Sequence, residues 1–575
     1  MSGIRAWRNL PAGSAAPALL CIPPFPGART LPLAVPVVDR AAAPSHSDDM
    51  AQSCIEAVRA GRVGGCFWGA QPALAGRSLL LRPATVAQVR LMLARVKDMG
   101  LQHEAAIWLN GPMRAARSTI AADIPKIDDA SDPWYLFDQA DMLWCDAGDE
   151  LALLARMAGR QVVCFGEGRF GALGTAQASG DLEDAVSTHL IAGFAYRNPF
   201  TGDDIPLVEA IELLAFWRRL IDANRPLRAA VGFAFWKRAA VAPLLWGGGD
   251  IPFVSDPAML RRLPAGSAVA LWRSKASPSL IEEMDRAGLV ARDVEDGFIR
   301  SAGLGADCVP PLSIVVDALG AHFDPAGPTE LENMLRAGGF PPALLERAAR
   351  LRSRIVESGI GKYGAGGGAL DRPGGERRHI LVTGQVEDDR SVQCGGGDVG
   401  GNLDLLRRVR LHEPDAFILY KPHPDVEAGH RKGHVQDRDA LAHADRVVRD
   451  VPISALLAMV DGVHVLTSLA GFEALLRGKA VTTHGVPFYA GWGLTTDLGI
   501  VPSRRGVPRT IDELVAAVLL LYPRYLDPVT RLPCPPEILV RHLAGNIDFG
   551  NPWIVGMRRL QGRVMRRWTE GRGTR

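Results

Sequence analysis

The chain has 575 residues, of which 47% are hydrophobic and 22% are charged, and its formal net charge is +2. A chain of this length is too long for one hydrophobic core. At a typical size of about 150 residues per domain, we expect several domains. The composition excludes extensive disorder, and the small net charge excludes a general nucleic-acid-binding protein. Any anion that the protein binds is therefore expected to be recognised locally.

The cysteines and the apolar stretches favour a reducing, cytoplasmic location. The eight cysteines are scattered, with no C-x-x-C pair and no histidine cluster beside them, which predicts neither a zinc site nor a disulfide framework. A proline-rich run at 21–26 would break a signal helix, and no stretch reaches the roughly 18 uncharged apolar residues of a membrane span. We therefore expect a protein of the cytoplasm.

Residues 1–225 contain a faint copy of a later part of the chain. Residues 196–201 resemble 525–530, residues 160–166 resemble 479–485, and residues 106–112 resemble 418–424, in the same order. Such a repeat predicts a Rossmann-like α/β domain over 1–225. The alternative is that two Rossmann-like domains look alike by architecture alone.

Several side chains of the later copy that could bind a ligand or take part in a reaction are replaced in the first copy. Asn110 and Gly111 stand in place of Pro422 and His423, and Asp149 and Leu154 stand in place of Ser468 and Glu473. We interpret residues 1–225 as a degenerate, non-catalytic half-module that kept its fold and lost its site.

Residues 226–375 favour a complete Rossmann-like domain. Strands are predicted at 268–272 and 289–294, with a helix at 280–287 between them. The segment 364–378 is rich in glycine and charge, and it is predicted to be a linker over a cleft.

Residues 376–545 show the same alternation of β-type and helical runs, which is typical of a doubly wound α/β sheet. Strands are predicted at 416–420, 462–466 and 480–484, and a helix at 469–477. Open α/β sheets bind ligands at the carboxyl ends of their strands, so the site is expected there, in a cleft between two Rossmann-like domains.

Residues 546–575 form a basic amphipathic tail. Arginines alternate with large apolar residues at near-helical spacing, which suits the anionic headgroups of a membrane surface. The alternative is a terminal helix packed on the body of the protein with its arginines in solvent.

Two motifs suit a nucleotide-linked substrate. Lys421 and His423 follow a buried strand, where a lysine and an imidazole can meet a phosphate. Thr467 and Ser468 open a helix whose free backbone N–H groups attract an anion, and Glu473 lies about one turn further on, where it can accept from ribose hydroxyls.

Two further motifs place carboxylates beside an arginine at strand ends, at 295–301 and at 384–391. Taken singly, such carboxylates are usually only solvated. Paired across a cleft, they can supply a nucleophile and an acid/base. An aromatic and glycine-rich run at 487–497 is predicted to line a sugar or base pocket.

In this order the motifs resemble those of the KpsC-type capsule polysaccharide β-Kdo transferases. The likeness covers about 230–540 and rests on the runs 295–301, 384–391, 420–426, 467–475 and 487–497. That family carries two modules in tandem, whereas this chain has one complete module and a degenerate half-module. A single active module is implied.

The resemblance implies a GT-B pair of Rossmann-like domains and a retaining glycosyltransferase of capsule polysaccharide biosynthesis. The implied donor is CMP-Kdo, and the implied acceptor is a lipid-linked Kdo of the lyso-phosphatidylglycerol type. No metal and no other cofactor are implied. The implied partners are the inner face of the bacterial inner membrane and the capsule assembly or export complex, with no nucleic acid.

The resemblance also implies roles for individual residues. Asp389 is the expected nucleophile, with Asp388 as its rival, and Glu295 is expected first to protonate or later to deprotonate the acceptor hydroxyl. His423 is expected to stabilise the leaving phosphate. The expected donor-binding residues are Lys421, Thr467, Ser468, Glu473 and Gln385. The residues expected to bind the substrate carboxylate or the acceptor are Arg300, Arg390 and Trp492.

Two other hypotheses remain at this point. The decayed first copy and the basic tail fit a non-catalytic partner in the capsule assembly or export complex. A transferase of another CMP-activated acidic sugar would meet the same recognition demands as a Kdo transferase.

Overall fold

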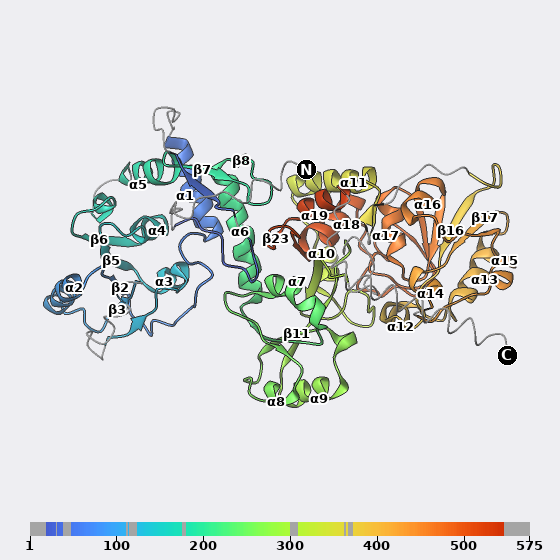
Figure 1. Cartoon of the computed structure of the whole chain (residues 1–575), viewed down its shortest axis with the longest axis horizontal. Helices are drawn as coiled ribbons and strands as arrows, with labels where there is room; N and C mark the ends of the chain where they lie inside the picture. The colour runs from blue at the N-terminus through green and yellow to red at the C-terminus, as the bar shows by residue number, and fades with distance from the viewer. Residues whose placement is uncertain are drawn as a thin grey trace. The chain divides into compact units, whose positions relative to one another are not determined.

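The computed structural model describes residues 19–29, 31–37, 48–110, 113, 124–174, 180–299, 309–361, 364–365, 372–429 and 431–545. The chain divides into two compact units (Figure 1), one of residues 1–226 with 246–250 and one of residues 227–245 with 251–575. Arg300 and the tail at 546–575 lie outside the described residues. No helix in the described part combines the length and the apolar character needed to traverse a bilayer.

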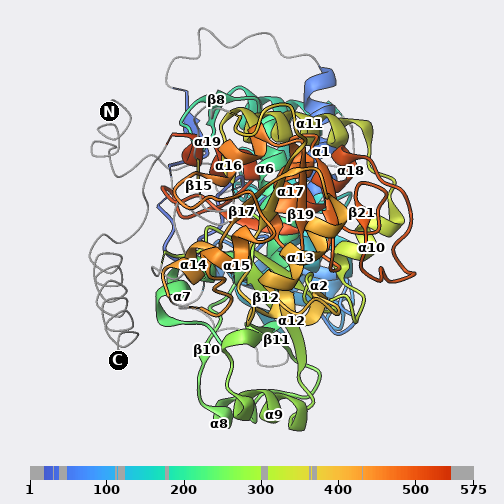
Figure 2. The same cartoon turned by 90° about the vertical axis from the view of Figure 1, so that its right-hand side faces the viewer.

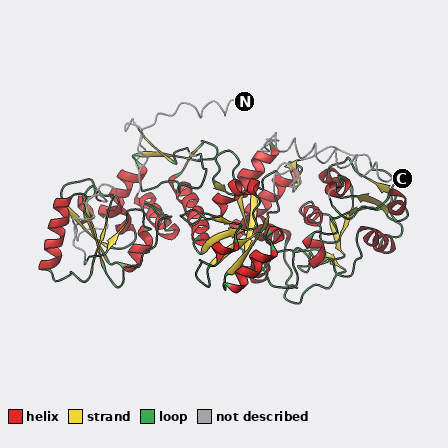
Figure 3. Ribbon diagram, turned by 60° about the horizontal axis from the view of Figure 1, so that its bottom comes forward, coloured by secondary structure: helices red, strands yellow, loops and turns green. Residues whose placement is uncertain are grey.

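The first unit is built on a five-stranded parallel sheet in the order β4-β3-β2-β5-β6. Its strands are β2 (Leu79–Arg82), β3 (Ala105–Trp108), β4 (Lys126–Ile127), β5 (Met142–Asp146) and β6 (Gln161–Phe165). Its helices include α2 (Val86–Asp98), α3 (Pro133–Gln139) and α4 (Leu151–Met157). β2 and β3 are buried at every position, as expected of apolar strands in a parallel sheet with helices on its faces (Figure 3).

A small antiparallel sheet completes the first unit. It pairs β1 (Ala34–Pro36) with β7 (Phe194–Arg197), and β7 with β8 (Asp204–Ile205). Helix α5 (Gly180–Val186) runs into a π-helical turn, η5 (Ser187–Ile191), just before β7, and α6 (Leu207–Asn224) packs on α1 (Asp48–Gly61).

The second unit contains two sheets, and the first has seven strands in the order β10-β9-β11-β12-β13-β22-β23. Its strands are β9 (Leu227–Val231), β10 (Phe253–Val254), β11 (Ala268–Leu271), β12 (Val290–Asp296), β13 (Ser313–Asp317), β22 (Pro523–Leu526) and β23 (Pro533–Cys534). Strands β10, β9, β11 and β12 are parallel to one another. The pairings β12–β13, β13–β22 and β22–β23 are antiparallel.

Helices flank this first sheet of the second unit. They include α7 (Phe235–Leu245), α8 (Pro257–Leu260), α9 (Pro278–Arg286), α10 (Glu330–Ala337) and α11 (Pro342–Glu357). Figure 2 shows α8 and α9 beyond the ends of β10 and β11. Apolar residues of α9 and the three parallel strands β9 to β11 share one core cluster.

The other sheet of the second unit has six parallel strands in the order β18-β17-β16-β19-β20-β21. They are β16 (His379–Thr383), β17 (Phe417–Lys421), β18 (Arg446–Val447), β19 (Gly462–Val465), β20 (Ala480–Thr483) and β21 (Thr496–Asp497). The accompanying helices include α12 (Arg390–Gly395), α13 (Asn402–His412), α14 (Pro424–Glu427) and α17 (Leu469–Leu476). Leu405, Leu406 and Val409 pack α13 onto Ile380 and Ile418 of the sheet.

The fold class that the sequence predicts is confirmed: the protein is α/β, with two Rossmann-like sheets in the second unit and one in the first. The six strands and helices predicted in the second unit from 280 onward, and the strand at 268–272, lie within two residues of the observed bounds.

One expected boundary is wrong. Residues up to 545 were assigned to the second Rossmann-like domain, but β22 and β23 extend the sheet of the first one, next to β13. Helices α18 (Ile511–Val515) and α19 (Pro536–Ala544) also pack on α11, through the ion pairs Arg352–Asp512 at 2.9 Å and Arg347–Glu537 at 2.6 Å. Local patterning predicts that a segment is a strand, but it does not say which sheet the strand joins.

The two units contain one arrangement twice. The order β4-β3-β2-β5-β6 of the first unit corresponds to β18-β17-β16-β19-β20 of the second. In each unit a π-helical turn then leads into an antiparallel strand, and a buried tyrosine in that strand donates to the carbonyl six residues earlier, Tyr196 to Leu190 at 2.6 Å and Tyr525 to Leu519 at 2.9 Å. The repeat seen in the sequence is therefore a repeat of topology.

Candidate functional site

The carboxyl edge of the six-stranded sheet gathers most of the predicted donor-binding residues. Strand β16 lies between β17 and β19. Lys421 and His423 leave β17, Gln385 follows β16, and Thr467 and Ser468 follow β19. Because the three strands are parallel neighbours, their carboxyl ends deliver these side chains to one edge.

Gln385 and Thr467 bind each other across this edge. The Gln385 Nε2 donates to Thr467 Oγ1 at 2.9 Å, and the Thr467 backbone N–H donates to Gln385 Oε1 at 2.8 Å. The backbone of Gln385 is held in turn by Asn402 at the start of α13, at 2.8 Å in both directions. The Thr467 hydroxyl accepts in this pair, and a hydroxyl that accepts can still donate its own proton.

Helix α17 begins at this edge. The Ser468 hydroxyl accepts from the Ala470 N–H at 3.2 Å, and the Tyr489 hydroxyl donates to the Ser468 carbonyl. The first N–H groups of a helix and its dipole attract a negative charge. Glu473 lies in the same helix and is 7% exposed.

His423 is held in one tautomer. Its Nδ1 accepts the Asp425 N–H at 3.1 Å, at the start of α14. The proton of the neutral imidazole therefore sits on Nε2, which makes Nε2 a donor.

Lys421 lies next to His423 and is also fixed. Its ammonium donates to the Arg449 carbonyl at 2.9 Å. Burial lowers the pKa of Lys421, and Asp450 and Glu427 act in the opposite direction. Lysine and histidine thus provide a cation and a donor at the end of one strand.

Asp389 caps the short helix α12. Its carboxylate accepts from the Ser391 hydroxyl at 2.6 Å and from the Ser391 N–H at 3.3 Å. Arg431 lies 3.2 Å from Asp388 and 4.0 Å from Asp389, and the two carboxylate side chains are 41% and 51% exposed. Asp389 is therefore oriented by hydrogen bonds while one of its faces meets solvent.

Glu295 stands at the carboxyl end of β12, in the other sheet of this unit. Burial first, and then the neighbouring Asp296, raise the pKa of Glu295, and Lys237 and Arg390 act in the opposite direction; together they leave this pKa at about 8. Arg390 follows Asp389 directly. The charge of Arg390 acts on Glu295, so the two carboxylate motifs lie within electrostatic range of each other.

Phe298 ties the Glu295 segment to the other sheet. Its ring centroid lies 4.7 Å from Phe488 and 6.3 Å from Phe472, which belongs to α17. All three rings are nearly buried. This aromatic contact fixes the loop after β12 against the helix that begins at Ser468.

Two residues of the site were not predicted. Lys237 of α7 is 7% exposed, lies 3.4 Å from Asp296 and has its ammonium 3.3 Å from the Trp272 ring centroid. Arg431 faces the two aspartates. The signal for Lys237 was the run Trp236-Lys237-Arg238, but no sequence pattern links Arg431 to Asp388 across 43 residues.

The prediction for Trp492 is wrong. Its side chain is 0% exposed and its indole N–H donates to the Phe488 carbonyl at 3.0 Å. Tyr489 is also 0% exposed. Residues 487–490 and Trp492 are buried, and the rings of Phe488 and Tyr489 pack against Phe472 of α17, so the aromatic part of the run at 487–497 belongs to the core. Its conformation also depends on Arg505, which is buried and donates to the Pro487 carbonyl at 2.6 Å.

One group in the described part of the chain has donor atoms spaced for a metal ion, namely His412, Glu413 and His464. The Glu413 carboxylate accepts from Arg378 at 2.8 Å, and His464 Nδ1 lies 3.1 Å from His484 Nε2. None of the predicted site residues belongs to this group.

Two Rossmann-like sheets in one unit, with a carboxyl edge of each lined by polar side chains, define a protein of the GT-B glycosyltransferase fold class. A family model described as "Capsule polysaccharide biosynthesis protein" matches residues 267–364 and 368–525. Over these residues the chain belongs to the capsule polysaccharide biosynthesis family.

Individual relatives agree with this assignment. The capsule polysaccharide modification protein LipA of Neisseria meningitidis serogroup A is 40% identical over 342 residues, which are 58% of this chain and 48% of that protein. The lipopolysaccharide-processing protein LpsZ of Rhizobium meliloti is 46% identical over 236 residues, 40% of this chain and 53% of that protein. The chain thus spans about half the length of these relatives.

A solved structure described as Thermosulfurimonas dismutans KpsC, beta Kdo 2,4 transferase, is 33% identical, with a TM-score of 0.48 over 55% of this chain and 98% of that one.

Proposed function

We propose that the second unit is a retaining β-Kdo transferase that moves Kdo from CMP-Kdo to a lipid-linked Kdo acceptor during capsule biosynthesis. The observation that carries this proposal is that Glu295, whose pKa is raised to about 8, lies within electrostatic range of Arg390, the residue that follows the oriented Asp389. Double displacement at a sugar carbon requires two carboxyl groups, one that exchanges a proton and one that is oriented as a nucleophile.

The donor's phosphate fits the edge of the six-stranded sheet. The start of α17, the Thr467 hydroxyl and the Nε2 donor of His423 can each meet a phosphate oxygen. When CMP departs, negative charge grows on that phosphate, and these fixed donors stabilise it without reorganising. The sugar's carboxylate requires a cation nearby, and Arg390 is the described residue that we assign to it.

The first chemical step uses Asp389. A carboxylate oxygen of Asp389 attacks the anomeric carbon, the bond from that carbon to the CMP phosphate oxygen breaks, and the electron pair leaves with CMP. The Ser391 hydroxyl, 2.6 Å from the carboxylate, holds it in position for this attack.

The second step uses Glu295. The acceptor hydroxyl attacks the same carbon, Glu295 takes the hydroxyl proton, and Asp389 leaves as a carboxylate. Two inversions give net retention. Because only ionised Glu295 accepts a proton, its raised pKa predicts a transfer rate that increases with pH up to about 8.

The test is direct transfer. We would incubate the full chain with CMP-Kdo and a synthetic acceptor carrying a terminal Kdo, and follow the product by mass spectrometry and NMR. A β-linked Kdo product supports the donor, the acceptor sugar and retention together. If the protein binds CMP but forms no product over the whole range from pH 6 to pH 9, the proposed reaction is contradicted. Competition by other CMP-linked acidic sugars separates Kdo from its rivals.

We also propose that the protein acts at the inner face of the inner membrane, beside the capsule assembly machinery. The support is the proposed lipid-linked acceptor and the alternation of arginine with apolar residues at 546–575. Sedimentation with vesicles containing anionic lipid, before and after deletion of 546–575, tests the membrane contact. Equal sedimentation of both forms would remove the tail from the proposal.

A further inference from the structure

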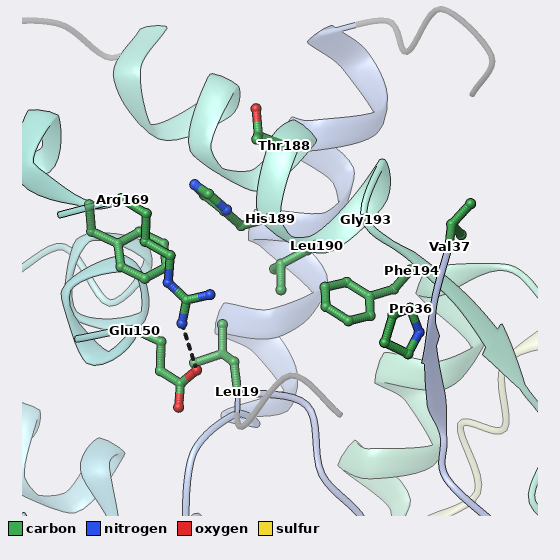
Figure 4. Close-up of a pocket in the computed structure, with 11 residues that line it drawn as sticks. Leu19, Pro36, Val37, Glu150, Arg169, Thr188, His189, Leu190, Gly193 and Phe194 are labelled. Carbon is green, nitrogen blue, oxygen red and sulfur yellow. Dashed lines mark ion pairs between the residues drawn. The ribbon is translucent and has the colours of Figure 1, made fainter. Parts of the chain in front are cut away.

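The first unit contains a cavity of about 300 Å³ (Figure 4). It lies between the start of α4, the loop after β6, the turn η5, the start of β7 and strand β1. Its lining includes Glu150, Arg169, Phe170, His189, Leu190 and Phe194. All of these residues belong to the copy that lost the residues of the proposed transferase site.

The corresponding elements of the second unit can be matched residue by residue. Tyr196 pairs with Ala34 of β1, and Tyr525 pairs with Ser313 of β13, in the same antiparallel register. Both tyrosines donate to the carbonyl six residues earlier. Counting back three residues from each tyrosine, Gly193 in the first unit corresponds to Tyr522 in the second.

In the second unit this space is filled by aromatic rings. Tyr522 is 5% exposed and donates to Asp317 at 2.8 Å. Its ring centroid lies 6.3 Å from Phe298, and Phe298 lies 4.7 Å from Phe488. Gly193 has no side chain, so the first unit keeps the surrounding elements and leaves the space between them open.

The two sides of this cavity differ in chemistry. Figure 4 shows Arg169 and His189 on one side, and Phe194, Pro36 and Val37 on the other. The Arg169 guanidinium lies 3.6 Å from the Glu150 carboxylate and 4.8 Å from the Phe170 ring centroid. The Arg169 side chain is 55% exposed, so the guanidinium can turn toward a ligand while remaining near its partner.

The cation on the polar side can meet an anion. The Arg169 guanidinium is paired with Glu150 at the cavity wall and is 55% exposed. Burial and Asp149 raise the pKa of Glu150, while Arg169 and Arg82 lower it. An apolar side next to an available cation is the pattern of a small-molecule pocket, and the cavity volume falls at the lower end of the range of about 300–1,000 Å³ for such pockets.

We propose that this cavity binds a small hydrophobic anion, with an aromatic or branched apolar body against Leu190 and Phe194 and its charge at Arg169. The site is separate from the proposed transferase site and does not depend on that activity. The cavity corresponds to the space that the rings of Tyr522 and Phe298 fill in the second unit.

The fluorescent probe 8-anilinonaphthalene-1-sulfonate tests this site, since it joins an aromatic body to a sulfonate. The central variant is Gly193→Tyr, which gives the first unit the side chain of the second. A Cβ at Gly193 meets only the Thr188 carbonyl, at 3.5 Å, which is ordinary contact. The matched control is Gly249→Tyr, in the same unit, where an added Cβ meets nothing within 4 Å.

We expect saturable probe binding by the full chain. Gly193→Tyr should weaken it at least tenfold, Arg169→Ala several-fold, and Gly249→Tyr not at all, with unchanged circular dichroism and melting. Val37, which is 40% exposed at the apolar rim, offers a pair that does not disturb the core: V37E should weaken binding and V37K should strengthen it. Absence of saturable binding, or equal binding by Gly193→Tyr and wild type, overturns the proposal. If Gly193→Tyr melts at a lower temperature than wild type, the Val37 pair decides the test. Equal probe binding by V37E and V37K then also overturns the proposal.

Discussion

The starts of helices α4 and α17 occupy the same place in the two copies of the sheet, and they differ in charge. In the second unit the Ser468 hydroxyl accepts from the N–H two residues on, at 3.2 Å. In the first unit the Asp149 carboxylate accepts from the corresponding N–H of Leu151 at 3.0 Å. Both side chains satisfy the helix, but only the hydroxyl leaves the helix start without a negative charge.

The first copy also fills this place from within. Arg82 lies 2.7 Å from Asp149 and 2.9 Å from Asp129, and its guanidinium stacks 4.6 Å from the Trp108 ring centroid. An internal arginine and two carboxylates thus take the position in which the second copy has the hydroxyls of Thr467 and Ser468. The fold therefore tolerates either set of side chains, and we expect anion binding to depend on the charge at this helix start.

The largest expected effect comes from removing the proposed nucleophile of the second unit. Asp389→Ala should lower Kdo transfer roughly 10³-fold or more, because the covalent step is lost. Release of CMP from CMP-Kdo measures it, with the melting temperature as a check on folding. Asp388→Asn is the matched control, since its residue contacts the same Arg431. A normal rate in Asp389→Ala with a slow Asp388→Asn would transfer the role to Asp388.

Glu295→Gln should reduce transfer by about 10²–10⁴-fold, which is typical of a lost general base. Burial raises the pKa of Glu295 to about 8, so wild-type kcat/KM should rise as pH increases toward 8 and level off above it. The variant should lose this rise. A wild-type rate that falls through pH 8 would mean that the protonated form is the active one, and Glu295 would then be an acid.

The comparison itself can be broken by Ser468→Asp, which gives the second copy the charge of the first. We expect donor binding to weaken roughly 10–100-fold, or about 1.4–2.8 kcal/mol, because a carboxylate at the helix start repels phosphate. Calorimetric titration with CMP measures this change. Ser468→Asn retains an N-cap acceptor without the charge and should bind nearly as well as wild type. Equal weakening by both variants would point to shape and not to charge.

The smallest effect concerns what both copies share. Tyr196→Phe and Tyr525→Phe each remove a hydroxyl that donates to a buried carbonyl six residues earlier. Each should cost about 1 kcal/mol in the free energy of unfolding. Two resolved melting transitions, each lowered by only one of the variants, would sharpen the equivalence of the two units. If only one of the two variants lowers the free energy of unfolding, the two tyrosine hydrogen bonds do not contribute equally to stability.

The sequence by itself determined the class of fold and much of the site. Short apolar runs ending in polar or glycine-rich residues predict buried parallel strands such as β17, β19 and β20, because burial on both faces leaves little freedom of composition. Ligand sites at the carboxyl ends of parallel strands predict that His423 and Thr467 lie at one edge, and the structure places them there together with Gln385, which the family resemblance had indicated. The repeat was readable because both copies keep the tyrosine-containing strand before their last helices.

Only the tertiary structure decided the rest. It assigned β22 and β23 to the first sheet of the second unit, because strand pairing depends on which edge is open in space. It buried Trp492 and brought Arg431 to Asp388, because packing and long-range ion pairs join residues that no local period connects. The open space at Gly193 likewise follows from what the neighbouring elements fill or leave empty, and composition does not record that.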